Sequence, residues 1–138
     1  HHLAFENKYL FPKPCMIGSR IAKVINSGID ISDGFFGDLK KLSNFKYGFD
    51  LDSSKFPFSN YSKSLINNKI VKSSELLNGG DDYELIFTCS EKNNDLISKI
   101  AKINNVKISK VGRIIKKKGI FVNGKKLNII KGSYMHSF

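Results

Sequence analysis

The stretch GIDISDG, residues 28–34, joins a strand-like apolar pattern to a glycine turn and contains two aspartates, Asp30 and Asp33. Gly34 interrupts the strand pattern, and the sequence FFGDLKKL that follows, residues 35–42, has its apolar residues at helical spacing. The stretch therefore predicts a buried strand that turns directly into a helix, with carboxylates placed at the turn.

Two interpretations of these polar side chains are open. Side chains alternate along a strand, so Asp30 and Ser32 are expected on one face and Ile29 and Ile31 on the other. The carboxyl ends of strands and the amino ends of helices are common ligand sites. Asp33 would repel a phosphate unless a cation such as Mg²⁺ lay between them, which predicts one wall of a magnesium–nucleotide site. Alternatively, Asp33 caps the helix and Asp30 accepts a buried hydrogen bond.

A second acidic cluster lies in NGGDDYEL, residues 78–85. Its two glycines would let backbone approach a ligand closely, and Asp81, Asp82 and Glu84 follow within four residues. This pattern fits a site for a metal or for a cationic or hydroxylated substrate. The alternative is a helix ended by glycine and followed by a solvated acidic turn, and this motif taken alone favours that alternative.

The rest of the chain alternates helical and strand patterns. Asp38, one turn into the helix at 35–42, is predicted to be a solvated helix position. Asn123-Gly124 favours a type I′ hairpin turn within residues 119–130. Further helices are expected within 19–27, 60–77 and 91–103, the last with Ser90 as its N-cap, and strands within 45–52, 82–90 and 106–115. The interleaving predicts an α+β layered fold with a mixed sheet.

Composition bounds the class of protein. A chain of 138 residues with 41% hydrophobic residues fits one globular domain, residues 1–138, and shows no apolar run long enough for a membrane helix. Cys15 and Cys89 are far apart with no metal-binding spacing, and with no secretory signal visible they favour reduced thiols in the cytoplasm. The net charge of +11 would suit an anionic partner. Arg20 and Arg113 are the only arginines, however, so a lysine-rich solvated surface is the simpler interpretation and a nucleic-acid role is not favoured.

The order and spacing of the motifs resemble one enzyme family. YLFPKP, GIDISDGFxxDL, NGGDDYELIFT and a final GxYxHxF follow one another along almost the whole chain. This combination resembles the C-terminal half of the thiamine-monophosphate kinases, a family related to aminoimidazole ribonucleotide synthetase. The resemblance implies a layered α/β/α fold with a mixed sheet, like the C-terminal domain of that synthetase.

The resemblance also implies an activity and its residues. Family members transfer the γ-phosphoryl group of ATP directly to thiamine monophosphate, using Mg²⁺. By the family pattern, Asp30 and Asp33 are magnesium ligands and Ser32 contacts ATP. Asp81 occupies the position of a family glutamate that contacts thiamine monophosphate, and Tyr134 would lie beside the thiamine, where a carboxylate and an aromatic face suit a cation.

The resemblance carries departures and rivals. Cys15 stands where the family has an arginine, and Asp81 is one methylene shorter than the family glutamate. The N-terminal half, which in the family supplies most metal and ATP contacts and the dimer interface, is missing from these residues, so they are expected to be inactive alone. The rival functions are another ATP-dependent synthetase of the superfamily and a non-catalytic basic module that binds nucleic acid or other anions.

Overall fold

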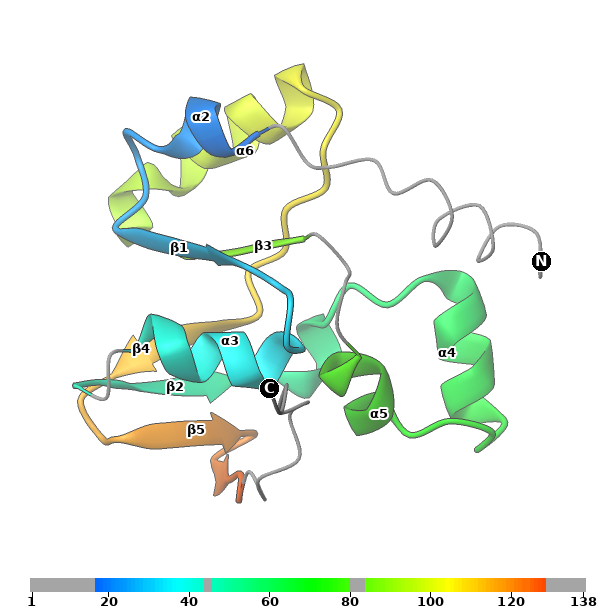
Figure 1. The fold of residues 1–138 in the computed structure, drawn as a ribbon. Helices are drawn as coiled ribbons and strands as arrows, with labels where there is room; N and C mark the ends of the chain where they lie inside the picture. The colour runs from blue at the N-terminus through cyan, green and yellow to red at the C-terminus, as the bar shows by residue number, and fades with distance from the viewer. Residues whose placement is uncertain (1–16, 44–45, 80–83, 129–138) are drawn as a thin grey trace, which may run out of the picture.

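The computed structural model describes residues 17–43, 46–79 and 84–128 (Figure 1). The helices are α2 (Gly18–Ile21), α3 (Phe35–Leu42), α4 (Asn60–Asn67), α5 (Ser73–Asn78) and α6 (Asn94–Ile103), with single 3₁₀ turns at Ser53–Lys55 and Glu91–Asn93. The strands are β1 (Ser27–Asp30), β2 (Gly48–Leu51), β3 (Leu85–Thr88), β4 (Gly112–Ile115), β5 (Gly119–Val122) and β6 (Lys125–Lys126).

The strands form two sheets. β1 pairs antiparallel with β3, with Asp30 opposite Leu85. The second sheet has the order β4-β2-β5-β6, in which β2 and β5 run parallel and the other pairs antiparallel. The predicted mixed sheet is therefore confirmed.

The elements are stacked in alternating layers. Figure 1 shows α2 and α6 on one side of the β1–β3 pair and α3 on the other side, followed by the sheet that contains β2 and β5. α3 contacts both β1 and β5, so it separates the two sheets. Helices on both faces of β1–β3 give the predicted α/β/α layering.

The hydrophobic core lies where α3 meets both sheets. Phe36 and Leu39 of α3 are at most 5% exposed and pack with residues of β2, β3 and β5. The other buried members of this cluster are Phe49, Leu51, Phe56, Ile86 and Ile120. Because Ile29 and Ile31 also pack against this cluster, the core fixes the position of the β1–α3 connection.

Several local predictions are confirmed. Helices occur within 60–77 and at 35–42, and strands occur within 45–52 and 82–90. Asn123 and Gly124 both have positive φ, 50° and 76°, as a type I′ turn requires.

Other local predictions are wrong. Within 106–115 only Gly112–Ile115 is a strand. The neighbouring strand β2 has four residues to pair with it, and the last hydrogen bond beyond them runs from the Asp52 N–H to the Val111 carbonyl. The short helix predicted within 19–27 is present but covers only the start of that range, as the single turn α2. Ser90 precedes a 3₁₀ turn and its side chain makes no cap bond.

Within the described ranges no helix combines the length and the apolar character that crossing a membrane requires.

Candidate functional site at the β1–α3 connection

Residues 31–34 connect the end of β1 to the start of α3. The backbone N–H of Ile31 donates to the carbonyl of Glu84 at 2.8 Å, which extends the β1–β3 pairing by one residue. Since Ile29 and Ile31 face the core, Asp30 and Ser32 face away and are exposed. The alternation predicted for this strand is confirmed, and it presents two polar side chains to solvent at the strand end.

Gly34 brings this connection against the end of α5. Its φ is +86°, and a Cβ at this position would lie 2.7 Å from the carbonyl oxygen of Asn78. Glycine is therefore required here for both backbone conformation and space. Asn78 immediately precedes the second acidic segment and Glu84 ends it, and both contact the β1–α3 connection. The fold thus brings both described ends of the second acidic motif, Asn78 and Glu84, next to the first motif.

Asp38 is the residue that sequence reasoning misplaced. It was predicted to be solvated, but it is 0% exposed. Its Oδ2 accepts hydrogen bonds from the backbone N–H groups of Ser32 and Asp33, each at 2.9 Å, and its Oδ1 accepts one from Lys41 Nζ at 2.8 Å. A buried carboxylate is stable only with such partners. Asp38 therefore holds the backbone of the connection onto the first turns of α3.

Lys41 joins the buried carboxylate to a more exposed one. Its ammonium also donates to Asp33 Oδ2. These hydrogen bonds, to Asp33 and then to Asp38, raise the pKa of the Lys41 ammonium. Burial by itself raises the pKa of Asp38, but the hydrogen bonds from Lys41 and from the backbone of Asp33 and Ser32 outweigh it and lower that pKa below its ordinary value. Both groups are therefore held in their charged forms.

The alternative interpretation of the two aspartates is not what the structure shows. The N-cap of α3 is Gly34, and no side chain makes a cap bond there. Asp30 is exposed, and within the described ranges its carboxylate has no hydrogen bond or ion pair. Neither aspartate side chain caps α3, and Asp33 is paired with Lys41 instead.

The donor set fits a hard divalent cation in part. Carboxylate oxygens are the protein ligands that Mg²⁺ prefers, and Mg²⁺ is often held by one or two carboxylates with phosphate and water completing its shell. Among residues 17–43, 46–79 and 84–128, no group of three or more His, Cys, Asp or Glu is close enough to hold a metal. The pair Asp30 and Asp33 can therefore supply one side of a magnesium site, with further ligands from outside these ranges or from phosphate. The other predicted site residues, Asp81 and Tyr134, lie outside the described residues, as does Cys15.

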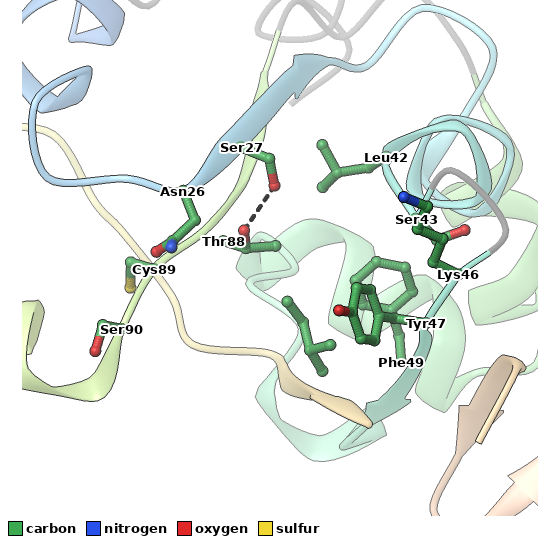
Figure 2. A pocket seen from close by; sticks show the side chains of 11 residues that line it. Asn26, Ser27, Leu42, Ser43, Lys46, Tyr47, Phe49, Thr88, Cys89 and Ser90 are labelled. Carbon is green, nitrogen blue, oxygen red and sulfur yellow. Dashed lines mark hydrogen bonds between the residues drawn. The ribbon is translucent and has the colours of Figure 1, made fainter. Parts of the chain in front are cut away.

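A cavity lies at the other end of β1. Its volume is about 440 Å³. The hydroxyls of Ser27 and Thr88 are hydrogen-bonded at 2.6 Å, and Figure 2 shows them facing each other, with Cys89 on the same strand segment. Tyr47 and Phe49 form the opposite wall. Of the predicted site residues that the structure describes, Asp30, Ser32 and Asp33, none lines this cavity, and sequence reasoning did not indicate it.

The fold resembles solved structures of thiamine-monophosphate kinases. The crystal structure of thiamine-monophosphate kinase from Stenotrophomonas maltophilia K279a is 26% identical, with a TM-score of 0.75 over 90% of this chain and 40% of that one. A second structure, AaThiL complexed with AMPPCP and TMP, is 29% identical, with a TM-score of 0.74 over 91% of this chain and 39% of that one. The predicted fold class is confirmed. No protein-family model matches the chain.

The sequence comparison is more specific. Thiamine-monophosphate kinase from Buchnera aphidicola subsp. Acyrthosiphon pisum is 35% identical over 136 residues, which is 94% of this chain and 41% of the relative. The chain is thus a homologue of the thiamine-monophosphate kinases, and it spans about two fifths of the length of the curated relatives it matches. The resemblance predicted from the motifs is confirmed.

Proposed function

We propose that this chain is the C-terminal domain of a thiamine-monophosphate kinase, which transfers the γ-phosphoryl group of ATP to thiamine monophosphate and forms thiamine diphosphate. The observation that supports this most is the β1–α3 connection, where Asp30 and Asp33 lie close together in sequence and neither caps α3, in a homologue of named kinases. AaThiL complexed with AMPPCP, an ATP analogue, and TMP supports ATP and thiamine monophosphate as the substrates.

In this proposal the connection positions charge for an in-line transfer. Asp30 and Asp33 hold Mg²⁺, and Ser32, exposed between them, contacts ATP. Bound there, Mg²⁺ would neutralise the oxygens of the phosphates as they approach each other. Asp38 and Gly34 fix the backbone, so the carboxylates are in place before the nucleotide arrives, and such positioning accounts for much of the rate of phosphoryl transfer.

We assign the substrate contacts to residues outside the described ranges. Asp81 contacts thiamine monophosphate, where its carboxylate suits the cationic thiazolium, and Tyr134 offers an aromatic face to the same ring. Asp81 lies in the sequence between Asn78 and Glu84, and both of those residues contact the β1–α3 connection, which supports this assignment.

The proposed kinase also needs a second domain and has an assigned oligomeric state and cellular compartment. An N-terminal domain of the same protein supplies most metal and ATP contacts, and the whole protein is a cytoplasmic homodimer. The incomplete donor set at Asp30 and Asp33 supports the need for a second domain. Nucleic acid and membranes are not among the proposed partners.

The decisive experiment measures thiamine diphosphate formed from ATP and thiamine monophosphate by the whole protein. Residues 1–138 alone are expected to form none. In the whole protein, Asp33→Asn is expected to lower kcat at least a hundredfold while the unfolding temperature stays near that of wild-type, because one metal ligand is lost. The matched control is Asp95→Asn, which removes one carboxylate from the exposed start of α6.

The outcomes separate the alternatives. Wild-type protein without activity on thiamine monophosphate, but active with another phosphate acceptor, would move the proposal to a related synthetase. Unchanged kcat in Asp33→Asn would remove that residue from the metal site.

A further inference from the structure

Lys41 occupies a position between two carboxylates of different accessibility. The lysine side chain is 52% exposed, its partner Asp33 is 33% exposed, and its partner Asp38 is 1% exposed. One ammonium therefore contacts an inner carboxylate that water does not reach and an outer one that water does.

The two contacts differ in how easily they can be exchanged. Asp38 also binds two backbone N–H groups, so loss of its oxygen atoms would leave buried donors without partners. For Asp33, Lys41 is the donor that the structure records within the described ranges. An ion pair between partly exposed groups contributes little to stability. The Lys41–Asp33 contact can therefore be replaced at low cost, whereas the Lys41–Asp38 contact is retained.

The charges at the connection favour such a replacement. The carboxylates of Asp30, Asp33 and Asp38 together with the ammonium of Lys41 leave a net charge of minus two, which one divalent cation would neutralise. Mg²⁺ and the ammonium would compete for the same oxygen, Oδ2 of Asp33. A lysine side chain is long and flexible enough to leave this oxygen while its base remains on α3.

We propose that Lys41 is the counter-ion of Asp33 in the metal-free protein, and that a divalent cation displaces its ammonium from Asp33 while Asp38 keeps hold of the lysine. This inference rests on the proposed function for the identity of the metal site. It assigns Lys41 as a positioning residue: its ammonium keeps Asp33 oriented in the absence of metal and weakens metal binding by competition.

The test is metal affinity, measured without turnover. Mn²⁺ is titrated into the whole protein, free Mn²⁺ is followed by electron paramagnetic resonance, and Mg²⁺ is used to displace it. Lys41→Met removes the competing charge at similar volume and is expected to tighten the site roughly three- to fivefold, since an exchangeable exposed ion pair is lost. Lys41→Gln serves as a second uncharged variant, and Lys41→Arg, which keeps the charge, is expected to stay within about twofold of wild-type.

The matched control is Lys63→Met. Lys63 lies in α4, is exposed, and makes no hydrogen bond or ion pair with either carboxylate. Lys63→Met changes the net charge of the protein by the same amount as Lys41→Met, and a distant exposed charge is largely screened at physiological salt. The affinity of the Lys63→Met protein for Mn²⁺ is therefore expected to remain within about 1.5-fold of wild-type.

Each outcome decides between the claims. If Lys41→Met and Lys41→Gln bind Mn²⁺ no more tightly than Lys63→Met, or more weakly, the counter-ion proposal is wrong even if the protein is a kinase. If Asp33→Asn binds Mn²⁺ as wild-type does, Asp33 is not a ligand, and the inference falls together with the metal assignment. If the Asp33-dependent site tightens in Lys41→Met but the protein does not phosphorylate thiamine monophosphate, the inference stands and the proposed activity is wrong.

Discussion

Replacing Asp38 tests whether the β1–α3 connection is held by a buried carboxylate. The carboxylate accepts two backbone hydrogen bonds at 2.9 Å and one from the Lys41 ammonium at 2.8 Å. Hydrogen bonds to charged groups contribute about 1.5–3 kcal/mol each, and unpaired buried donors cost about 1–3 kcal/mol. All three hydrogen bonds end on the side chain of Asp38, which is 0% exposed.

Two substitutions at this position should give graded effects. Asp38→Asn keeps an oxygen for the backbone donors of Ser32 and Asp33 but turns an amide nitrogen toward Lys41, so it should lower the free energy of unfolding by about 2 kcal/mol. Asp38→Ala removes every acceptor and should lower it by about 3–4 kcal/mol, because Lys41 can return to water whereas the backbone donors cannot. At roughly 3 °C per kcal/mol for a chain of this size, the melting temperatures fall by about 6 °C and about 10 °C.

The pH dependence provides a second measurement. The folded-state pKa of Asp38 lies below its ordinary value of 3.8, so its charge contributes stability that is fully present above the unfolded-state pKa and is lost as pH falls through the folded-state value. Wild-type protein should therefore lose stability below about pH 5, and Asp38→Asn should lose less over the same range. Thermal unfolding followed by circular dichroism between pH 7 and pH 3 measures both effects.

The control for Asp38 is again Asp95→Asn, an exposed carboxylate in the first turn of α6. Its removal should change stability by no more than about 1 kcal/mol through the helix dipole. If Asp38→Ala unfolds within 1 °C of Asp95→Asn, the buried carboxylate does not hold the connection and the reasoning above is wrong.

Two further predictions concern packing. Gly34→Ala should lower the free energy of unfolding by about 2–3 kcal/mol in urea titrations, because the added Cβ meets the Asn78 carbonyl at 2.7 Å in a backbone with φ +86°; a loss below 0.5 kcal/mol would mean that the connection does not pack on α5 as described. Ile21→Ala should cost about 2–5 kcal/mol because Ile21 is 0% exposed, whereas Ile70→Ala, at a residue 66% exposed, should cost less than 1 kcal/mol; equal denaturation midpoints would contradict the burial of α2.

Short-range patterns account for the parts of the fold that the sequence predicted well. The strand-to-helix turn at 28–42 and the hairpin at Asn123-Gly124 depend on residues that are neighbours in the chain: alternating apolar positions, and glycines where φ is positive. Such features hold whatever the rest of the molecule does, and the structure retains them.

The wrong predictions depend on distant partners. Residues 106–110 alternate like a strand, but a strand needs an edge to pair with, and β2 offers four residues. Leu96 and Ile103 belong to the apolar pattern of α6, yet they are 47% and 78% exposed, because the helix buries Ile97 and Ala101 instead. The element that packs against the helix, and not the helix itself, decides which of its apolar residues face inward.

Asp38 shows the same limit at the site. One local signal existed, since a carboxylate three residues before a lysine on a helix can form an ion pair with it. What the spacing could not show is that the preceding connection turns its two N–H groups back onto the same carboxylate. Only the folded path of the chain makes burial of this charge favourable.

The arrangement divides the acidic residues of this region by role. Asp38 is buried and both of its oxygens accept hydrogen bonds, so it stabilises the connection. Asp30 and Asp33 keep exposed oxygens, which is unfavourable for local stability because like charges repel unless a cation lies between them. Lys41 offsets part of this repulsion, and two carboxylates remain too few to enclose Mg²⁺, which takes six ligands. Within the described residues, the negative charge of Asp30 and Asp33 is therefore only partly compensated. Such an arrangement is expected of a domain whose site is completed by a metal ion, by nucleotide phosphates and by a second domain.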